Sequence, residues 1–207
     1  KMTHDELIEQ FKKELPGEKS HLAFMPFRGR SSEEIKKGIT FRDSAVAIIL
    51  FHNEAGRLST IVTRRQVYDG SHSGQISFPG GKKEIDDDNL LDTAIRECYE
   101  EIGVHARNFE LLKELTPLFV PVSKFLISPY VFYSDRTSFD YIRSEREVAS
   151  IHELDLLDLY ASESVVNLDI KINNEFVMKN VPHFKQDEIL IWGATALILN
   201  ELKDILV

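Results

Sequence analysis

Residues 96–104 read Arg-Glu-Cys-Tyr-Glu-Glu-Ile-Gly-Val, and this stretch decides how the rest of the chain is interpreted. It continues a helix that we expect from about Asn89 to Ile102, and at about 100° per residue the side chains separate into two faces. The apolar face consists of Leu91, Ala94, Ile95, Cys98 and Ile102, and the acidic arc consists of Glu97, Glu100 and Glu101. The pattern therefore predicts an amphipathic helix whose apolar face packs on a core.

The acidic arc allows two interpretations. Glutamates on a helix usually form a solvated face. However, Glu97 and Glu101 are like charges four residues apart, and such a pair weakens a helix unless a cation relieves it. Clustered oxygen donors without Cys or His suit Mg²⁺ or Mn²⁺ rather than Zn²⁺. The cluster is therefore more reasonable if a divalent cation normally occupies it, and the solvated face stays the alternative.

The same nine residues carry a family resemblance. They match the Nudix signature Arg-Glu-U-x-Glu-Glu-x-Gly-U at every defined position, where U is a bulky apolar residue. The resemblance to Nudix hydrolases implies an α/β fold, namely an α/β/α sandwich around a mixed β-sheet. It also implies metal-dependent hydrolysis of a nucleoside-diphosphate compound, with Mg²⁺ or Mn²⁺ as cofactor. By position, Glu97, Glu100 and Glu101 would hold the metal ions, Arg96 would orient a glutamate, and Gly103 would end the helix.

One acidic position of the signature is ambiguous. The distance from Gly81 to Arg96 is one residue longer than in the general signature. The glutamate expected in between falls on Asp87 when counted from Gly81, and on Asp88 when counted back from Arg96. An aspartate therefore replaces the glutamate, and two candidates stay open.

The segment upstream resembles the motif of the coenzyme A pyrophosphatase branch of the family. The residues that match in register are Thr63, Arg65, Gly74, Phe78, Pro79, Gly80 and Gly81. Two positions depart from the motif, because Gln66 replaces its serine and Gly70 replaces its second arginine. Coenzyme A carries a 3′-phosphate as well as its diphosphate, and arginine is a natural clamp for phosphate. Gly70 therefore weakens the assignment of coenzyme A as the substrate, but it does not affect the assignment of the helix glutamates.

The resemblance implies a set of site residues. Those for substrate binding are Arg64, Arg65, Gly74, Phe78, Pro79, Gly80 and Gly81, and the catalytic set is Arg96, Glu97, Glu100, Glu101 and Glu147. The general base is open between Glu100, Glu101 and a glutamate of a later loop, either Glu145 or Glu147. An exposed loop charge is the ordinary alternative for Glu147.

The resemblance leaves three functions open. The first is hydrolysis of coenzyme A or acyl-CoA to 3′,5′-ADP and 4′-phosphopantetheine or its acyl derivative. The second is hydrolysis of another diphosphate compound, such as ADP-ribose or NADH, which the Gly70 departure keeps open. The third is a ligand-sensing Nudix domain without turnover, which ranks last because all three signature glutamates are retained.

Composition limits the partners. The chain has 207 residues with 34 acidic and 25 basic side chains, a formal charge of −9, and 43% apolar residues. Such a chain can bury a core, and its negative charge argues against binding nucleic acid. The longest apolar run, Ala45–Phe51, is far shorter than the roughly 20 residues of a membrane span. The single cysteine, Cys98, fits a reducing, cytoplasmic setting. The expected partner is a small nucleotide substrate.

The remaining pattern predicts an N-terminal helix and extended arm over residues 1–42 and a Nudix hydrolase domain over residues 43–207. Helices are expected at 5–14, 32–37, 154–160 and 191–206, with the rest of 17–40 mostly extended. Strands are expected at 44–51, 58–63, 74–78, 110–119, 125–133, 165–172 and 175–181, the first two and the last two forming hairpins. The arm could pack on its own domain or on a partner subunit, so a homodimer is an open alternative.

Overall fold

The computed structural model describes residues 2–68, 74–172 and 174–207. Its helices are α1 (His4–Lys12), α2 (Glu18–Phe24), α3 (Ser31–Lys36), α4 (Leu90–Ile102), α5 (Leu156–Leu159) and α6 (Gly193–Leu206), with 3₁₀ turns η1 (Ala106–Asn108) and η2 (Ser162–Ser164). The expected helix over 89–102 is confirmed as α4. None of the helices in the described residues is long and apolar enough to cross a membrane.

The strands form a large mixed sheet and a small antiparallel one. They are β1 (Arg42–His52), β2 (Leu58–Arg65), β3 (Ile76–Ser77), β4 (Gly80–Lys82), β5 (Glu110–Glu114), β6 (Leu118–Val120), β7 (Phe125–Ser134), β8 (Val148–Asp155), β9 (Val165–Lys171), β10 (Val177–Gln186) and β11 (Ile189–Ile191). The large sheet has the order β3-β2-β1-β7-β5, with β4 on β1, β6 on β7 and β8 on β2. β1 and β7 are parallel, and the other pairs are antiparallel. The predicted mixed sheet and both predicted hairpins are confirmed.

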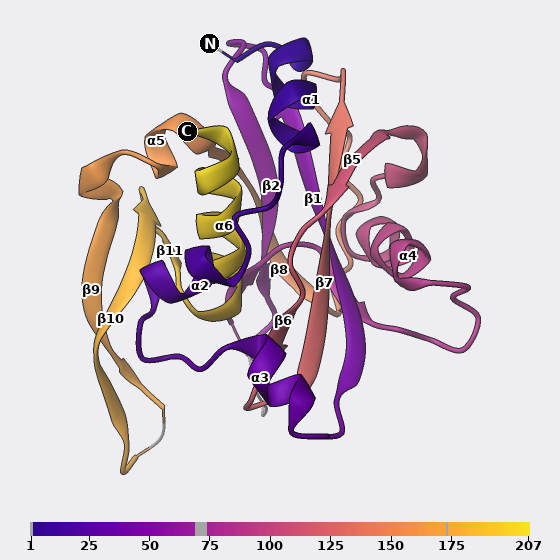
Figure 1. The fold of residues 1–207 in the computed structure, drawn as a ribbon. Coiled ribbons are helices and arrows are strands. Elements are labelled where there is room, and N and C mark those ends of the chain that lie inside the picture. The colour runs from indigo at the N-terminus through magenta and orange to yellow at the C-terminus, as the bar shows by residue number, and fades with distance from the viewer. Residues whose placement is uncertain (1, 69–73, 173) are drawn as a thin grey trace.

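β1 separates two hydrophobic cores. Successive side chains of a strand point to opposite faces. Ile48 and Leu50 therefore enter the core that α6 covers, whereas Ile49 and Phe51 enter the core that α4 covers. Figure 1 shows α4 on one side of the sheet and α6 on the other. This arrangement is the expected α/β/α sandwich.

The N-terminal segment is more helical than we expected. The sequence predicted mostly extended chain over 17–40, and this was wrong for α2. The helix docks on α6, where Ser20 and His21 are buried and Asn200 Nδ2 donates to Ser20 O at 2.7 Å. α1 also packs on this side, and its Leu7 and Phe11 belong to the α6 core. Tertiary contacts therefore stabilise a helix that is too short to form alone.

One predicted strand needed correction here, and two strands were not predicted. The strand predicted over 110–119 is broken into β5 and β6, because the N–H of Thr116 between them donates to Glu201 Oε2 instead of a strand. β8 was not predicted, because Ser150, His152 and Glu153 interrupt its apolar pattern. β11 was also not predicted, and it extends the β9–β10 hairpin to three strands.

The turn after β3 brings the glycine pair to α4. The predicted strand over 74–78 is reduced to β3, and the chain then continues through Pro79 into β4. β4 pairs with β1, with Gly81 opposite Ala45. This pairing places Gly80 and Gly81 between the sheet and the acidic face of α4.

Candidate active site

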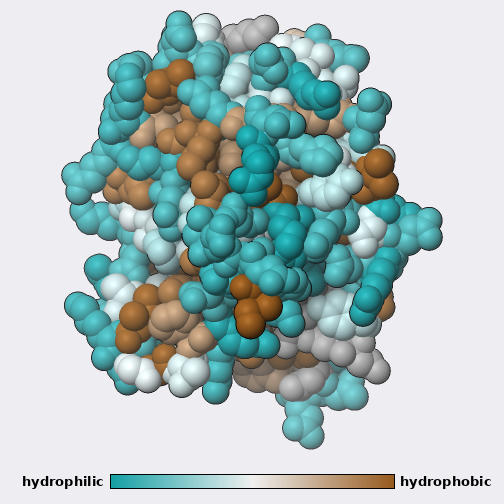
Figure 2. Space-filling view, turned by 90° about the vertical axis from the view of Figure 1, so that its right-hand side faces the viewer, coloured by the Kyte–Doolittle hydropathy of each residue, from teal (hydrophilic) through white to brown (hydrophobic). Residues whose placement is uncertain are grey.

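The ends of α4 are determined by local interactions. Asn89 caps the N-terminus and accepts from the Asp92 N–H at 2.9 Å. Gly103 ends the helix with φ = 73°, and a β-carbon there would lie 2.7 Å from Cβ of Ile142. Glycine satisfies both the left-handed backbone and the close approach, so its predicted role as the helix terminator is confirmed. Figure 2 looks onto this side of the molecule, where hydrophilic residues predominate and apolar residues form separate patches.

Arg96 is the centre of a network of carboxylates. Its Nε and Nη2 donate to the two oxygens of Asp87, both at 2.9 Å, while its Nη1 donates to Glu97 and Glu100, both at 3.1 Å. The hydrogen bonds from Arg96 hold the pKa of Asp87 well below its usual range. Asp87 is buried and Asp88 is exposed. The ambiguous acidic position therefore belongs to Asp87.

The Gly81 backbone lies directly against Glu97. A β-carbon at Gly81 would overlap the Glu97 carboxylate, so no larger residue fits here without moving that side chain. Burial raises the pKa of Glu97, and the neighbouring charges of Glu100 and Glu147 add to the effect. The glycine thus allows a main chain and a carboxylate to approach as closely as a ligand site requires.

Glu101 is the most perturbed carboxylate of this site. It is 4% exposed, and burial raises its pKa to about 8, an effect that Arg65 opposes and that Glu97 and Glu147 strengthen. Gly80 provides a backbone hydrogen bond to it. Within the described residues, Glu101 Oε2 and Arg65 Nε have no hydrogen-bond partner. Buried polar atoms without partners are rare and often mark a functional site.

A loop before β8 brings Glu147 to the same place. The Ser144 N–H donates to Glu101 O at 2.9 Å, and the Gln66 N–H donates to Glu147 O at 3.0 Å. The charge of Glu147 contributes to the raised pKa of both Glu97 and Glu101, so it lies within electrostatic reach of both carboxylates. The hydrogen bonds therefore hold a loop that is distant in sequence against the end of α4 that carries Glu101.

Comparisons with known proteins identify the family of the chain. The NUDIX domain model matches residues 41–170. The chain is 32% identical over 143 residues to a protein of Pectobacterium atrosepticum named uncharacterized Nudix hydrolase NudL, covering 69% of this chain and 72% of that protein. A Yersinia pestis protein of the same name is 32% identical over 142 residues, covering 69% of each chain. The chain belongs to the Nudix family. It is a Nudix hydrolase, and hydrolases of this family act on nucleoside diphosphate derivatives.

Solved Nudix structures share the fold. The NUDIX domain of Shewanella oneidensis NrtR, complexed with ADP ribose, aligns with a TM-score of 0.54 at 11% identity, over 86% of this chain and all of that domain. The Nudix hydrolase RenU of M. smegmatis aligns with a TM-score of 0.52 at 10% identity, over 79% of this chain and 84% of that one. At such identities the likeness shows the fold alone.

The remaining predicted Nudix site residues have different surroundings in the structure. Arg65, Gly80 and Gly81 lie beside the helix glutamates, as described. Arg64 instead donates from Nη1 to Gly74 O at 3.3 Å. Phe78 is 2% exposed and packs in the core beneath α6, where its side chain supports the fold instead of lining the site. Pro79 also lies in the buried turn. Gly70 lies outside the described residues.

Sequence reasoning missed two residues of the site. Thr93 donates from Oγ1 to Asp87 Oδ2 at 2.9 Å and so helps to fix the carboxylate that binds Arg96. Gln66 binds the Glu147 loop, and it entered the sequence analysis only as a departure from a motif. Thr93 precedes Arg96 by one helical turn, and this spacing was the only available signal.

Nudix hydrolases generally use divalent metals, and the local chemistry here fits such an ion. In the part of the chain that the structure describes, no three acidic, His or Cys side chains are already arranged to hold one metal. Glu97 and Glu100 are bound to Arg96 instead. Yet Glu101 has a buried oxygen without a partner, and burial raises its pKa, with a smaller contribution from repulsion by Glu97 and Glu147. A cation would remove that repulsion, and oxygen donors of this kind suit Mg²⁺ or Mn²⁺.

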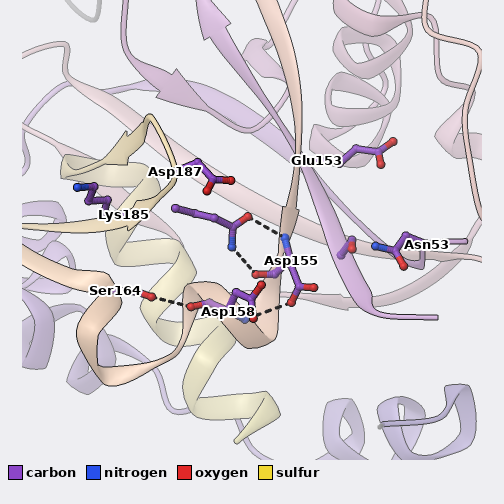
Figure 3. A pocket seen from close by; sticks show the side chains of 9 residues that line it. Asn53, Glu153, Asp155, Asp158, Ser164, Lys185 and Asp187 are labelled. Atoms are coloured by element: carbon purple, nitrogen blue, oxygen red, sulfur yellow. Dashed lines mark hydrogen bonds between the residues drawn. The ribbon is translucent and has the colours of Figure 1, made fainter. Parts of the chain in front are cut away.

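A pocket elsewhere does not coincide with this site. It has a volume of about 430 Å³ and lies between the end of β8, α5 and the β10–β11 turn (Figure 3). Its lining is polar, and four of the nine lining residues are acidic, namely Glu153, Asp155, Asp158 and Asp187. Arg57 already pairs with Asp155 and Asp158. Since no residue of α4 lines this pocket, we do not assign the Nudix chemistry to it.

Proposed function

We propose that this Nudix hydrolase cleaves the diphosphate bond of coenzyme A or acyl-CoA, releasing 3′,5′-ADP and 4′-phosphopantetheine or its acyl derivative. One observation carries the proposal: three elements of the motif that resembles the coenzyme A branch adjoin the helix glutamates. Gly81 abuts Glu97, Gly80 provides a backbone hydrogen bond to Glu101, and the charge of Arg65 opposes the rise in the pKa of Glu101. Arg65 Nε has no hydrogen-bond partner within the described residues, so its N–H could donate a hydrogen bond to a phosphate oxygen.

Different residues of the site would have different roles in the reaction. Bound Mg²⁺ or Mn²⁺ would neutralise the diphosphate and lower the pKa of a water molecule. Glu147 would accept a proton from the water that attacks one phosphorus, while the bridging oxygen leaves with the other phosphate. Glu97, Glu100 and Glu101 would hold the ions, and Arg96 would orient Glu97 and Glu100. In this proposal residues 43–207 carry the chemistry, and residues 1–42 brace α6.

A second candidate is hydrolysis of ADP-ribose or NADH. Gly70 favours this candidate. Coenzyme A carries a 3′-phosphate besides its diphosphate, ADP-ribose and NADH do not, and the second arginine of the motif, a natural clamp for phosphate, is missing here. The ADP ribose in the complex with the NrtR domain suggests the same ligand class. A ligand-sensing domain without turnover is the third candidate, and the retained glutamates count against it.

One experiment separates the three candidates. The purified chain is incubated with coenzyme A, acyl-CoAs, NADH and ADP-ribose, with Mg²⁺ or Mn²⁺, and the products are identified by mass. We expect 3′,5′-ADP from coenzyme A. Faster cleavage of ADP-ribose than of coenzyme A would overturn the first candidate, and no turnover of any compound would favour the sensor.

Two further proposals concern the setting of the enzyme. The lone buried Cys98 supports a reducing, cytoplasmic location. The homodimer stays a prediction, which sedimentation across a range of concentrations will test.

A further inference from the structure

Gln66 joins the end of β2 to the loop that carries Glu147. Its side-chain Nε2 donates to Glu145 O at 2.8 Å and to Val148 O at 3.4 Å. Its backbone N–H donates to Glu147 O at 3.0 Å. Gln66 therefore binds the loop at Glu147 and at Glu145 and Val148, which lie on either side of Glu147 in the sequence.

The opposite side of the loop is bound to α4. The Ser144 N–H donates to Glu101 O at 2.9 Å, and the Ile142 N–H donates to Ile102 O at 3.0 Å. Within the loop, the Val148 N–H donates to Ser144 O at 2.9 Å. The turn that carries Glu147 is thus held between the end of α4 on one side and Gln66 on the other.

The electrostatics of the site oppose this placement of Glu147. Glu147 is exposed, and its charge repels Glu97 and Glu101. Repulsion of this kind would move an unrestrained turn toward solvent. The hydrogen bonds of Gln66 counteract such a movement, because they fix the backbone at Glu145, Glu147 and Val148.

We propose that Gln66 is a positioning residue that holds Glu147 toward Glu97 and Glu101. This inference rests on the proposed function, in which Glu147 is the base. It also explains the departure of Gln66 from the motif that has serine here. A serine hydroxyl is too short to reach two carbonyl oxygens on either side of Glu147, so the longer amide is specific to the way this chain fixes its loop.

The test compares Gln66→Ala, Gln66→Ser, Glu147→Gln and the double variant Gln66→Ala/Glu147→Gln with the wild type. We expect Gln66→Ala and Gln66→Ser each to lower kcat about tenfold, a barrier increase of about 1.4 kcal/mol, with KM changed less than about twofold. In the Glu147→Gln background, Gln66→Ala should have no further effect, because both changes disable one unit. Gln10→Ala on α1 is the matched control and should match the wild type.

Hydrogen exchange provides a readout that is independent of activity. Gln66→Ala should speed exchange of the amides of residues 144–148 and leave those of α4 unchanged. Unchanged exchange, a full kcat in Gln66→Ala, a rise in KM alone, or a loss that persists in the Glu147→Gln background would each overturn the inference.

The two proposals fail differently. If the wild type cleaves none of the compounds, the proposed function fails, and the exchange result alone then decides whether Gln66 holds the loop. If the wild type is active and Glu147→Gln keeps full activity, Glu147 is not the base, and the positioning role of Gln66 falls while the hydrolase remains.

Discussion

Glu101 on α4 and Glu201 on α6 are both buried, at 4% and 0% exposed, on opposite sides of the same sheet. Glu201 accepts from the Gly17 N–H, from the Thr116 N–H and from Thr116 Oγ1, and His21 Nε2 lies 3.5 Å away. Burial alone would raise the pKa of Glu201, but the close His21 side chain and the hydrogen bonds from Thr116 outweigh burial and lower the pKa.

Glu101 has the same burial without these partners. One of its oxygens has no donor within the described residues, and burial raises its pKa to about 8. The difference shows how one residue type serves two purposes. A carboxylate that is fully paired by the protein stabilises the fold, whereas one that is left unpaired is available to a ligand. The following substitutions test this contrast, from the largest expected effect to the smallest.

Glu101→Gln should have the largest effect. It removes the charge that would bind a cation but keeps the shape of the side chain. We expect kcat/KM to fall about a thousandfold, or about 4 kcal/mol, while the free energy of unfolding changes by less than about 1 kcal/mol. Steady-state kinetics and urea unfolding provide the two measurements. A stable variant with near-normal activity would remove Glu101 from the site.

Glu201→Gln should show the opposite result. Its amide group would present N–H donors to the donors of Gly17 or Thr116, and this conflict should reduce the free energy of unfolding by about 3 kcal/mol. The kcat/KM of the folded enzyme should match the wild type. The contrast would break down if this variant lost activity without losing stability.

Asp87→Asn should have a smaller effect and sharpen the contrast, because Asp87 is fully paired yet lies in the site. An amide can accept from only one of the two Arg96 donors, so Arg96 loses its fixed orientation. We expect kcat/KM to fall about tenfold, or about 1.4 kcal/mol. Asp88→Asn is the matched control, and an equal loss there would reverse the assignment of the acidic position.

The pH dependence of unfolding should show the smallest effect. The pKa of Glu201 is lowered in the folded protein, so the unfolded chain takes up this proton first as pH falls. The stability that Glu201 contributes is then present above the unfolded value of 4.5 and is lost as pH falls below it. The difference in unfolding free energy between wild type and Glu201→Gln should therefore narrow from pH 5 toward pH 3. A constant difference would show that the Glu201 pKa is not lowered.

Local patterns made much of the fold predictable. The 3.6-residue period of α4 and the apolar run of β1 are strong signals within short windows, and both elements appear where expected. The acidic face of α4 also identified Glu97, Glu100 and Glu101 as candidates before any geometry was known.

Other features depend on segments that meet only in the folded chain. Gln66 and Glu145 are 79 residues apart, so no window of sequence could show their bond. The choice between Asp87 and Asp88 depended on which side chain turns toward Arg96. α2 was missed because its stability comes from α6, not from its own residues.

The docking of α2 on α6 has a consequence for the order of assembly. The hydrogen bond from Gly17 to Glu201 closes a loop of 184 residues. During synthesis from the N-terminus, the segment of α1 and α2 must wait for residues 193–206, whereas α4 can meet β1 much earlier. Leu7 and Phe11 therefore cannot pack against α6 until most of the chain has been synthesised. We expect the half that carries the Nudix helix to collapse first, and the opposite half to close in a slower step that depends on long-range contacts.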